Sequence, residues 1–308
     1  MGIPRRPGLG TLAADLDDDG DTDLVVTNDG RENFLWRNRG NGTFENDGVL
    51  AGLAVNREGR PEASMGIAAG DPDEDRDLDL LFTHLAQETN TLYLQEDGFF
   101  DDRTPVSGLG PPSLPYTGFG TAWIDADGDG RLDLVVVNGA VKMDTRAPTA
   151  EEPFPLQHPN HLYLQSEPLR FRMSPLTPDR SRDSEVSRGL AVGDIDLDRV
   201  PDLLISNDAG PARVLLGARA GTSGVLVEVV DREGRVLLGT RGRFREETEL
   251  HDRIATDGSY ASASAPWMLR EIPGVRRVDL RLDPPRGASV RFLGLPTDHR
   301  YRVILEGS

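Results

Sequence analysis

One short acidic pattern occurs four times along the chain and constrains its fold more than any other feature. The copies read AADLDDDGDTDLVVTN, AAGDPDEDRDLDLLFTH, AWIDADGDGRLDLVVVN and AVGDIDLDRVPDLLISN. Their first aspartates are Asp15, Asp71, Asp125 and Asp194, so successive copies start 56, 54 and 69 residues apart. The longest interval contains residues 140–159, a polar and proline-rich insertion that is typical of a surface loop. The chain therefore contains a tandem repeat with a period of about 55 residues.

Each copy has the same internal order of short segments. A strand of small residues, such as MGIAAG, precedes the acidic loop, and an apolar strand, such as LVVT, follows it. In three copies a further strand starts at Asn33, Asn90 or Asn160, and a segment with glycine and an aromatic residue closes the first two copies. The apolar stretches are too short for helices and are bounded by Gly, Asn and Asp, which indicates short antiparallel strands.

Repeated units of about four strands predict an all-β fold built from the blades of a β-propeller. A β-sandwich is the alternative, but it gives no reason for the repeat. The predicted repeats are residues 10–62, 63–113, 114–180 and 181–217, all within a first domain of residues 1–217.

The remainder of the chain, residues 218–308, lacks the acidic pattern. Segments such as GVLVEVVD, GRVLLGTR, VRRVDLRL and YRVILEG alternate apolar and polar residues. Alternation at period two is typical of strands with one buried face. We therefore expect a second, antiparallel β-domain here.

The composition excludes several classes of function. The formal net charge is −18, from 52 acidic and 34 basic residues, so the chain should repel the phosphate backbone of nucleic acids. There are no cysteines, which excludes disulfides and thiolate metal sites. No apolar run approaches the roughly 18–20 residues that span a bilayer, and the opening MGIPRRPGLG lacks the apolar core of a signal peptide. We therefore expect no membrane span, and either a cytosolic protein or a truncated exported one.

The repeated loop places carboxylates where a hard cation could be held. In the pattern Asp-x-Asp-x-Asp-Gly-x-x-Asp, a tight turn points positions 1, 3, 5 and 9 inward, and the carbonyl of position 7 can add an oxygen. Calcium accepts six to eight oxygens, whereas magnesium requires a stricter octahedron and is the second choice. Without a cation, the packed carboxylates would repel one another. The predicted calcium ligands are Asp15, Asp17, Asp19, Asp21 and Asp23; Asp71, Asp73, Asp75 and Asp79; Asp125, Asp127, Asp129 and Asp133; and Asp194, Asp196, Asp198 and Asp202.

The sixth loop position divides the four loops into two pairs. Gly20 and Gly130 permit the positive φ of the turn in the first and third loops. Arg76 and Arg199 stand there in the second and fourth loops, where a left-handed arginine costs about 1–2 kcal/mol and brings a positive charge near the ion. We expect up to four calcium ions, with the glycine-bearing loops binding more tightly. The alternative for any loop is a solvated acidic turn.

A second polar position recurs 13 residues after the first aspartate of each loop. It holds Asn28, Asn138 and Asn207, with His84 at the equivalent place in the second copy. Asparagine side chains commonly hydrogen-bond the backbone of turns. We therefore expect these residues to stabilise turns and not to ligate metal.

The four acidic repeats resemble FG-GAP or VCBS repeats, which form the blades of integrin α-subunit propellers. Phe119 and Gly120, before the third loop, retain the Phe-Gly pair. The segment TDGSYASASAPWMLREIPGVRRVDLRLDPPRGASVRFLGL resembles the ASPIC/UnbV domain that follows such repeats in the cartilage acidic protein family. There Ser262 and Ser264 loosely match a Ser-Gln-Ser strand, whereas the Phe-Gly-Leu-Gly and Trp-Pro-x-Gly motifs are not retained.

The resemblance implies a bacterial, secreted or periplasmic, calcium-binding protein with a role in cell adhesion or glycan contact. Members of that family usually carry about seven blades. Four visible repeats therefore imply either a truncated chain or a small four-bladed or open ring.

No catalytic motif is present in the sequence. GxSxG, HExxH, a phosphate-binding glycine loop and the Rossmann fingerprint are absent, and the five histidines show no metal or triad spacing. We therefore expect a non-catalytic protein that binds a protein or glycan partner.

Two alternatives to non-catalytic binding stay open. One is a glycan-active lyase or hydrolase on a propeller scaffold, since paired carboxylates can serve glycoside chemistry. The other is an accessory protein of a biosynthetic cluster. A pocket with Arg, His and paired carboxylates away from the calcium loops would favour an enzyme. A face lined by Tyr93, Tyr163 or Trp123 would favour binding, although the blade core is the expected place for these rings.

Overall fold

The fold is almost entirely β, which confirms the predicted class. The only helices in the described part of the chain are two single turns, α1 (Thr104–Ser107) and α2 (Gly110–Ser113). Among the described residues, no helical segment has the length and apolar character required to span a bilayer. The computed structural model describes residues 6–141, 156–177, 184–218, 224–245, 249–285 and 287–305, so most of the predicted insertion at 140–159 lies outside them.

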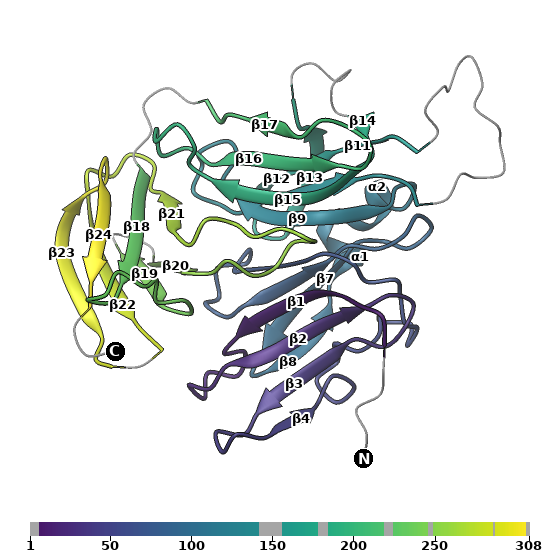
Figure 1. Cartoon of the computed structure of the whole chain (residues 1–308), viewed down its shortest axis with the longest axis horizontal. Helices are drawn as coiled ribbons and strands as arrows, with labels where there is room; N and C mark the ends of the chain where they lie inside the picture. The colour runs from purple at the N-terminus through teal and green to yellow at the C-terminus, as the bar shows by residue number, and fades with distance from the viewer. Residues whose placement is uncertain are drawn as a thin grey trace.

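Four antiparallel sheets follow one another along the chain, one for each acidic repeat, and we call them blades 1 to 4 (Figure 1). Each acidic loop joins the first two strands of its blade. Neighbouring strands of a blade follow one another in the sequence, with one interruption in blade 3. There β11 (His158–Pro159) lies in the chain between the second and third strands of the blade and pairs instead with β14 (Ser184–Glu185) in a small two-stranded sheet. The strands are β1 (Gly8–Ala14), β2 (Asp23–Asn28), β3 (Phe34–Asn38) and β4 (Phe44–Asn46) in blade 1; β5 (Ile67–Gly70), β6 (Asp79–Phe82), β7 (Thr91–Glu96) and β8 (Phe99–Asp102) in blade 2; β9 (Gly118–Ile124), β10 (Asp133–Asn138), β12 (His161–Glu167) and β13 (Arg170–Pro175) in blade 3; and β15 (Ser187–Gly193), β16 (Asp202–Asn207) and β17 (Arg213–Leu215) in blade 4.

Successive blades pack face to face, because side chains alternate between the two faces of each strand. On β6, Leu80 belongs to the core shared with blade 1, and Leu81 belongs to the core shared with blade 3. The outer faces of the first and last blades lack such a neighbour in the described chain, and Leu24 and Leu204 are 38% and 44% exposed there. The blades therefore form an open fan (Figure 1).

The C-terminal residues 224–305 form a module of two sheets around a separate core that includes Val227, Phe244 and Leu280. One sheet has the order β21-β18-β24 and the other β20-β19-β22-β23. The strands are β18 (Gly224–Val230), β19 (Arg241–Arg245), β20 (Glu249–Arg253), β21 (Met268–Glu271), β22 (Arg277–Asp283), β23 (Val290–Pro296) and β24 (Arg300–Ile304).

Two details of this module differ from the sequence prediction. The pair β18–β24 is parallel, so the module is not purely antiparallel. The predicted strand GRVLLGTR forms only a single bridge between Val230 and Val236, because Gly234 and Gly239 both adopt positive φ and interrupt it.

Residues 257–265, which we call the central segment, leave the module and run into the middle of the fan (Figure 1). The backbone N–H of Gly258 donates to Thr11 of β1, that of Ser259 to Ile67 of β5, and that of Ala265 to Val192 of β15. The central segment therefore joins the inner strands of blades 1, 2 and 4.

Candidate metal centres

Three aspartates in each acidic loop bring carboxylate oxygens within 4.8 Å of one another. Each group lies where the first strand of a blade ends, and it contains only oxygen donors, which suit a hard cation. Four equivalent places in the fold could therefore hold a metal ion. The groups are Asp15, Asp17 and Asp19; Asp71, Asp73 and Asp79; Asp125, Asp127 and Asp133; and Asp194, Asp196 and Asp202.

The remaining predicted ligands lie outside these groups of three. In the second, third and fourth loops the aspartate at the fifth position instead accepts a hydrogen bond from the backbone two residues on, as Asp129 does from Arg131 (2.9 Å) and Asp198 from Val200 (2.8 Å). These side chains therefore shape the turn. The predicted ligands outside the groups are Asp21, Asp23, Asp75, Asp129 and Asp198.

The aspartate at the ninth position has a second role that the spacing did not reveal. In the third loop, Oδ2 of Asp133 accepts from the backbone N–H of Ala126, and its Oδ1 accepts from that of Gln165, both at 2.8 Å. Asp133 is fully buried and joins the loop to the third strand of the blade. The equivalent Asp23, Asp79 and Asp202 are also fully buried.

Several loop oxygens are buried and lack a hydrogen-bond donor among the described residues. They include Oδ1 of Asp71, Oδ2 of Asp79 and Oδ1 of Asp194. Asp71 is only 8% exposed. A buried carboxylate oxygen without a partner is destabilising by about 1–3 kcal/mol or more. A bound cation would remove this penalty, so the donor set fits a hard dication.

Burial and like charge raise the pKa values of the loop carboxyls. Burial, followed by the neighbouring carboxylates, raises the pKa of Asp79 to about 10 and that of Asp71 to about 6. Burial also raises the pKa of Asp133 to about 7. Without a cation Asp79 would therefore retain its proton at neutral pH and Asp133 would be partly protonated, so a metal ion would compete with those protons.

All four residues at the sixth loop position adopt positive φ, as the alignment predicts. The angle is 91° at Gly20, Gly130 and Arg76, and 70° at Arg199. The guanidinium of Arg199 donates to the backbone carbonyl of Asp298 at 2.6 Å. Its positive charge is thus directed toward the C-terminal module.

The first loop differs from the others because two arginines bind its carboxylates. Nη1 of Arg37, on β3, lies 2.7 Å from Oδ2 of Asp23 and 3.5 Å from Oδ2 of Asp17. Nη2 of Arg241, in the C-terminal module, lies 2.7 Å from Oδ2 of Asp15. Neither contact has a local signal in the sequence, because both arginines lie outside the repeated pattern.

The recurring polar position after each loop has the predicted turn-stabilising role. Each side chain makes a hydrogen bond to a backbone carbonyl that closes a turn or connection, at 2.7–2.8 Å. The pairs are Asn28 with Glu32, His84 with Thr89, Asn138 with Pro159, and Asn207 with Pro211.

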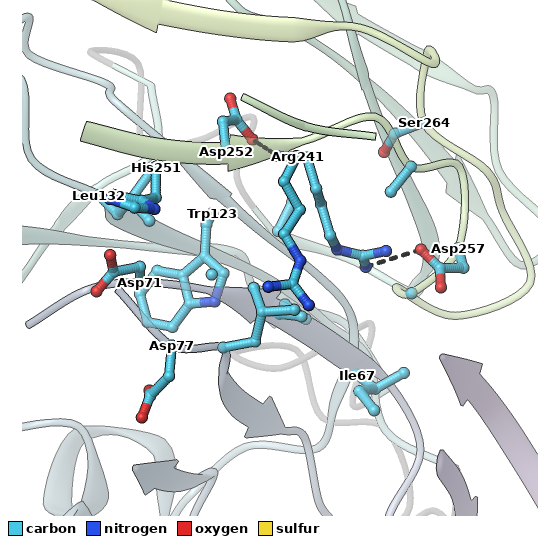
Figure 2. A pocket seen from close by; sticks show the side chains of 18 of the residues that line it. Ile67, Asp71, Asp77, Trp123, Leu132, Arg241, His251, Asp252, Asp257 and Ser264 are labelled. Carbon is cyan, nitrogen blue, oxygen red and sulfur yellow. Dashed lines mark hydrogen bonds and ion pairs between the residues drawn. The ribbon is translucent and has the colours of Figure 1, made fainter. Parts of the chain in front are cut away.

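A cavity of about 470 Å³ lies between the loops of blades 1 to 3 and the C-terminal module (Figure 2). Trp123, Arg241 and His251 line it together with loop aspartates. Tyr93 and Tyr163 are instead buried in the blade core, as expected. The cavity holds Arg, His and carboxylates, but the metal loops form part of its wall, so it does not meet the criterion for a separate enzymatic site.

Two solved structures show weak overall similarity to the chain. A lectin of Agrocybe aegerita, described as specifically recognising non-reducing terminal N-acetylglucosamine, is 17% identical with a TM-score of 0.36 over 68% of this chain and 52% of the lectin. The V. cholerae biofilm matrix protein Bap1 is 12% identical with a TM-score of 0.36 over 94% of this chain and 59% of Bap1. This chain thus spans between half and two thirds of either protein.

No curated protein matches the sequence. A family model does match, and it covers the first three acidic loops and the strands around them. The matched residues are 15–82 and 71–136, and the model describes the FG-GAP-like repeat. The chain therefore contains FG-GAP-like repeats.

Proposed function

We propose that this chain is a calcium-stabilised, non-catalytic binding protein of the β-propeller type, which acts in adhesion outside the cytoplasm. The observation that carries the proposal is a buried carboxylate oxygen without a hydrogen-bond donor at the first aspartate of three loops, in blades 1, 2 and 4, among the described residues. In this proposal residues 1–217 are the propeller domain and residues 218–308 an ASPIC/UnbV-like domain.

Calcium is the cation that these loops support best. The three carboxylates of each group leave room in the coordination shell for backbone carbonyls and water, which calcium tolerates in irregular geometry. Magnesium needs a near-ideal octahedron and is less easily stripped of water. In the third loop, Asp125, Asp127 and Asp133 would hold the ion, and the charge of that ion would offset their mutual repulsion.

Binding is supported over catalysis by the character of the cavity between the blades and the C-terminal module. Its charged groups belong to the metal loops and to arginine–carboxylate pairs such as Arg253 with Asp257 (2.8 Å). Paired charges of this kind can hydrogen-bond a partner molecule while their net charge stays balanced. The partner is a glycan or a protein surface presented outside the cell.

Metal titration tests the proposal. Thermal unfolding of the purified chain should be measured in excess chelator and then with increasing calcium or magnesium. A cation that binds only the folded state stabilises it by about 2.7 kcal/mol per site at 100 times its dissociation constant, so Tm should rise by several degrees or more. Calcium should act at lower concentration than magnesium. An unchanged Tm across the calcium titration would reject the structural role of the ion.

A matched pair of variants assigns the effect to the loops. Asp127→Asn removes one carboxylate of the third group without touching the buried anchor Asp133, and it should shift the calcium titration to higher concentration. Asp29→Asn removes an exposed carboxylate outside the groups and should leave the titration unchanged. A calcium-dependent glycan and protein binding screen would then identify the partner.

A further inference from the structure

The cavity between the blades and the C-terminal module has the size and composition of a small-molecule site. Its volume of about 470 Å³ is within the range of about 300–1,000 Å³ that ligand sites occupy. One wall consists of small residues of β5, including Ala69, with Trp123 of β9; Trp267 and Arg270 of the module line the cavity as well. Asp18 also lines it and has an 83% exposed side chain, so the cavity reaches solvent beside the first loop.

Two polar groups of this lining are buried without a hydrogen-bond partner in the described part of the chain. One is the indole N–H of Trp123, and Figure 2 shows that ring next to Asp71 in the middle of the lining. The other is Nε of Arg270, a residue only 5% exposed, which lies 3.7 Å from the carboxylate of Asp252 without a hydrogen bond. Both are donors, so the cavity offers hydrogen bonds to an incoming acceptor.

Acceptors stand beside these donors. The carboxylates of Asp252 and Asp257 pair with Arg270 and Arg253 and line the same cavity. A hydroxyl group can accept from a guanidinium or indole N–H and donate to a carboxylate at the same time. The rings of Trp123 and Trp267 add flat apolar surface next to these polar groups. A ligand with several hydroxyls and an apolar ring face would satisfy all of them.

The charge of the lining selects further among such ligands. Ten aspartates and four arginines line the cavity, so it carries an excess of negative charge that repels anions. Cations in the loops would reduce this excess, which leaves a neutral polyhydroxylated ligand as the best match.

We infer that this cavity binds a neutral carbohydrate of one or two pyranose rings, with Trp123 as the residue that contacts the ring. The inference rests on the proposed binding function and names the ligand class. Arg253, Arg270 and their paired aspartates bind the hydroxyls.

The test uses the full chain with saturating calcium. Binding of neutral methyl hexopyranosides, N-acetylhexosaminides and their disaccharides is measured by titration calorimetry and by tryptophan fluorescence, with glucuronic acid as the anionic comparison. At least one neutral sugar should bind with a dissociation constant of about 10 mM or tighter, whereas glucuronic acid should bind more weakly. Absence of saturable binding by every neutral sugar, or preference for the acid, would overturn the inference.

A pair of tryptophan variants locates the site. Trp123→Phe removes the unpartnered N–H and should weaken sugar binding about fivefold to tenfold. Trp36→Phe is the control, because Trp36 packs against Phe34 in blade 1 and does not line the cavity. Equal affinities of the two variants would contradict the assignment. If Trp123→Phe does not fold, acrylamide quenching of tryptophan fluorescence is measured on the Trp36→Phe protein, in which Trp123 and Trp267 remain. Bound sugar should reduce the quenching of these two indoles, and unchanged quenching would contradict the assignment.

The outcomes separate this inference from the proposed function. Stabilisation by calcium without sugar binding would leave the calcium-stabilised propeller in place and point to a protein partner. Sugar binding that is unaffected by chelator, together with an unchanged Tm, would instead reject the role of calcium while supporting the cavity as a sugar site.

Discussion

Arg241 in the C-terminal module places its Nη2 atom 2.7 Å from Oδ2 of Asp15, the first aspartate of the first loop, although the two residues are 226 positions apart. The same guanidinium also binds Asp18. The guanidinium of Arg241 therefore pairs with one carboxylate that the sequence pattern assigns to calcium.

This contact changes the expected order of calcium affinity. The first loop carries Gly20, but the guanidinium of Arg241 competes with the ion for Asp15 and should weaken binding there. Arg241→Gln should increase the calcium affinity of the first loop several-fold, because one competing positive charge is removed. The measurement is calorimetric calcium titration, or terbium luminescence, on wild type and variant. Arg243→Gln, on the same strand but paired with Asp283, is the control and should leave the affinity unchanged. Loss of calcium binding in Arg241→Gln would contradict the competition.

The metal-free chain should become less stable as the pH rises from about 6.5 to 8.5. The folded-state pKa values of Asp133 and Asp79, about 7 and about 10, lie above the ordinary value of 3.8. Such groups stabilise the fold while protonated, and that stability is lost as the pH rises through the folded pKa. Thermal unfolding in chelator across this range measures the effect. A Tm that increases with pH in chelator would disagree with this prediction.

Asp79→Asn tests the same carboxyl directly. The amide cannot ionise, so at pH 8 in chelator the variant should melt several degrees above wild type. With saturating calcium the order should reverse, because the second group loses one of its three carboxylates. Asp29→Asn again serves as the exposed control. A variant that is less stable than wild type in both conditions would indicate a purely structural role for Asp79.

His84 should make the fold sensitive to acid. Burial lowers its pKa to about 4, so the stability it contributes is present above the ordinary value of 6.5 and is lost as the pH falls through 4. Asparagine occupies the equivalent position in the other three repeats. His84→Asn should therefore reduce the loss of unfolding free energy between pH 6.5 and 4.5 by about 2 kcal/mol. Urea unfolding measures this change, and the exposed His299→Asn should show no such reduction.

Ser262 should contribute to the stability of blade 4. Its Oγ donates to the carbonyl of Leu190 at 2.6 Å and accepts from the N–H of the same residue at 3.1 Å. Ser262→Ala should therefore lower the free energy of unfolding by about 1–2 kcal/mol. Urea denaturation gives this value, with the exposed Ser166→Ala as the control. Equal stability of the two variants would show that water replaces the hydroxyl.

The blades could be predicted from the sequence because the signals that define them are local. Alternation at period two on β6 sends Leu80 and Leu81 to opposite faces, and the loop spacing fixes where each strand ends. The positive φ at Arg76 and Arg199 followed from alignment with the glycine-bearing loops. Local geometry thus repeats wherever the pattern repeats.

The differences between the loops could not be predicted in this way. Arg37 reaches Asp23 from β3, and Arg241 reaches Asp15 from another module, and neither arginine belongs to the repeated pattern. The spacing also could not show that both oxygens of Asp133 already accept backbone hydrogen bonds. Contacts between distant parts of the chain decide which oxygens are free, and a repeat pattern does not contain them.

The central segment has a consequence for how this chain folds during synthesis. Tandem repeats ordinarily need only their neighbours to fold, and can form one after another as they leave the ribosome. Here Thr11, Ile67 and Val192 accept hydrogen bonds from residues 258–265, which are made after all four blades. These three carbonyls therefore lack their partners until the late residues have been made, and such distant pairing is slow. Completion of the fold then becomes a single late event for all the blades that it joins.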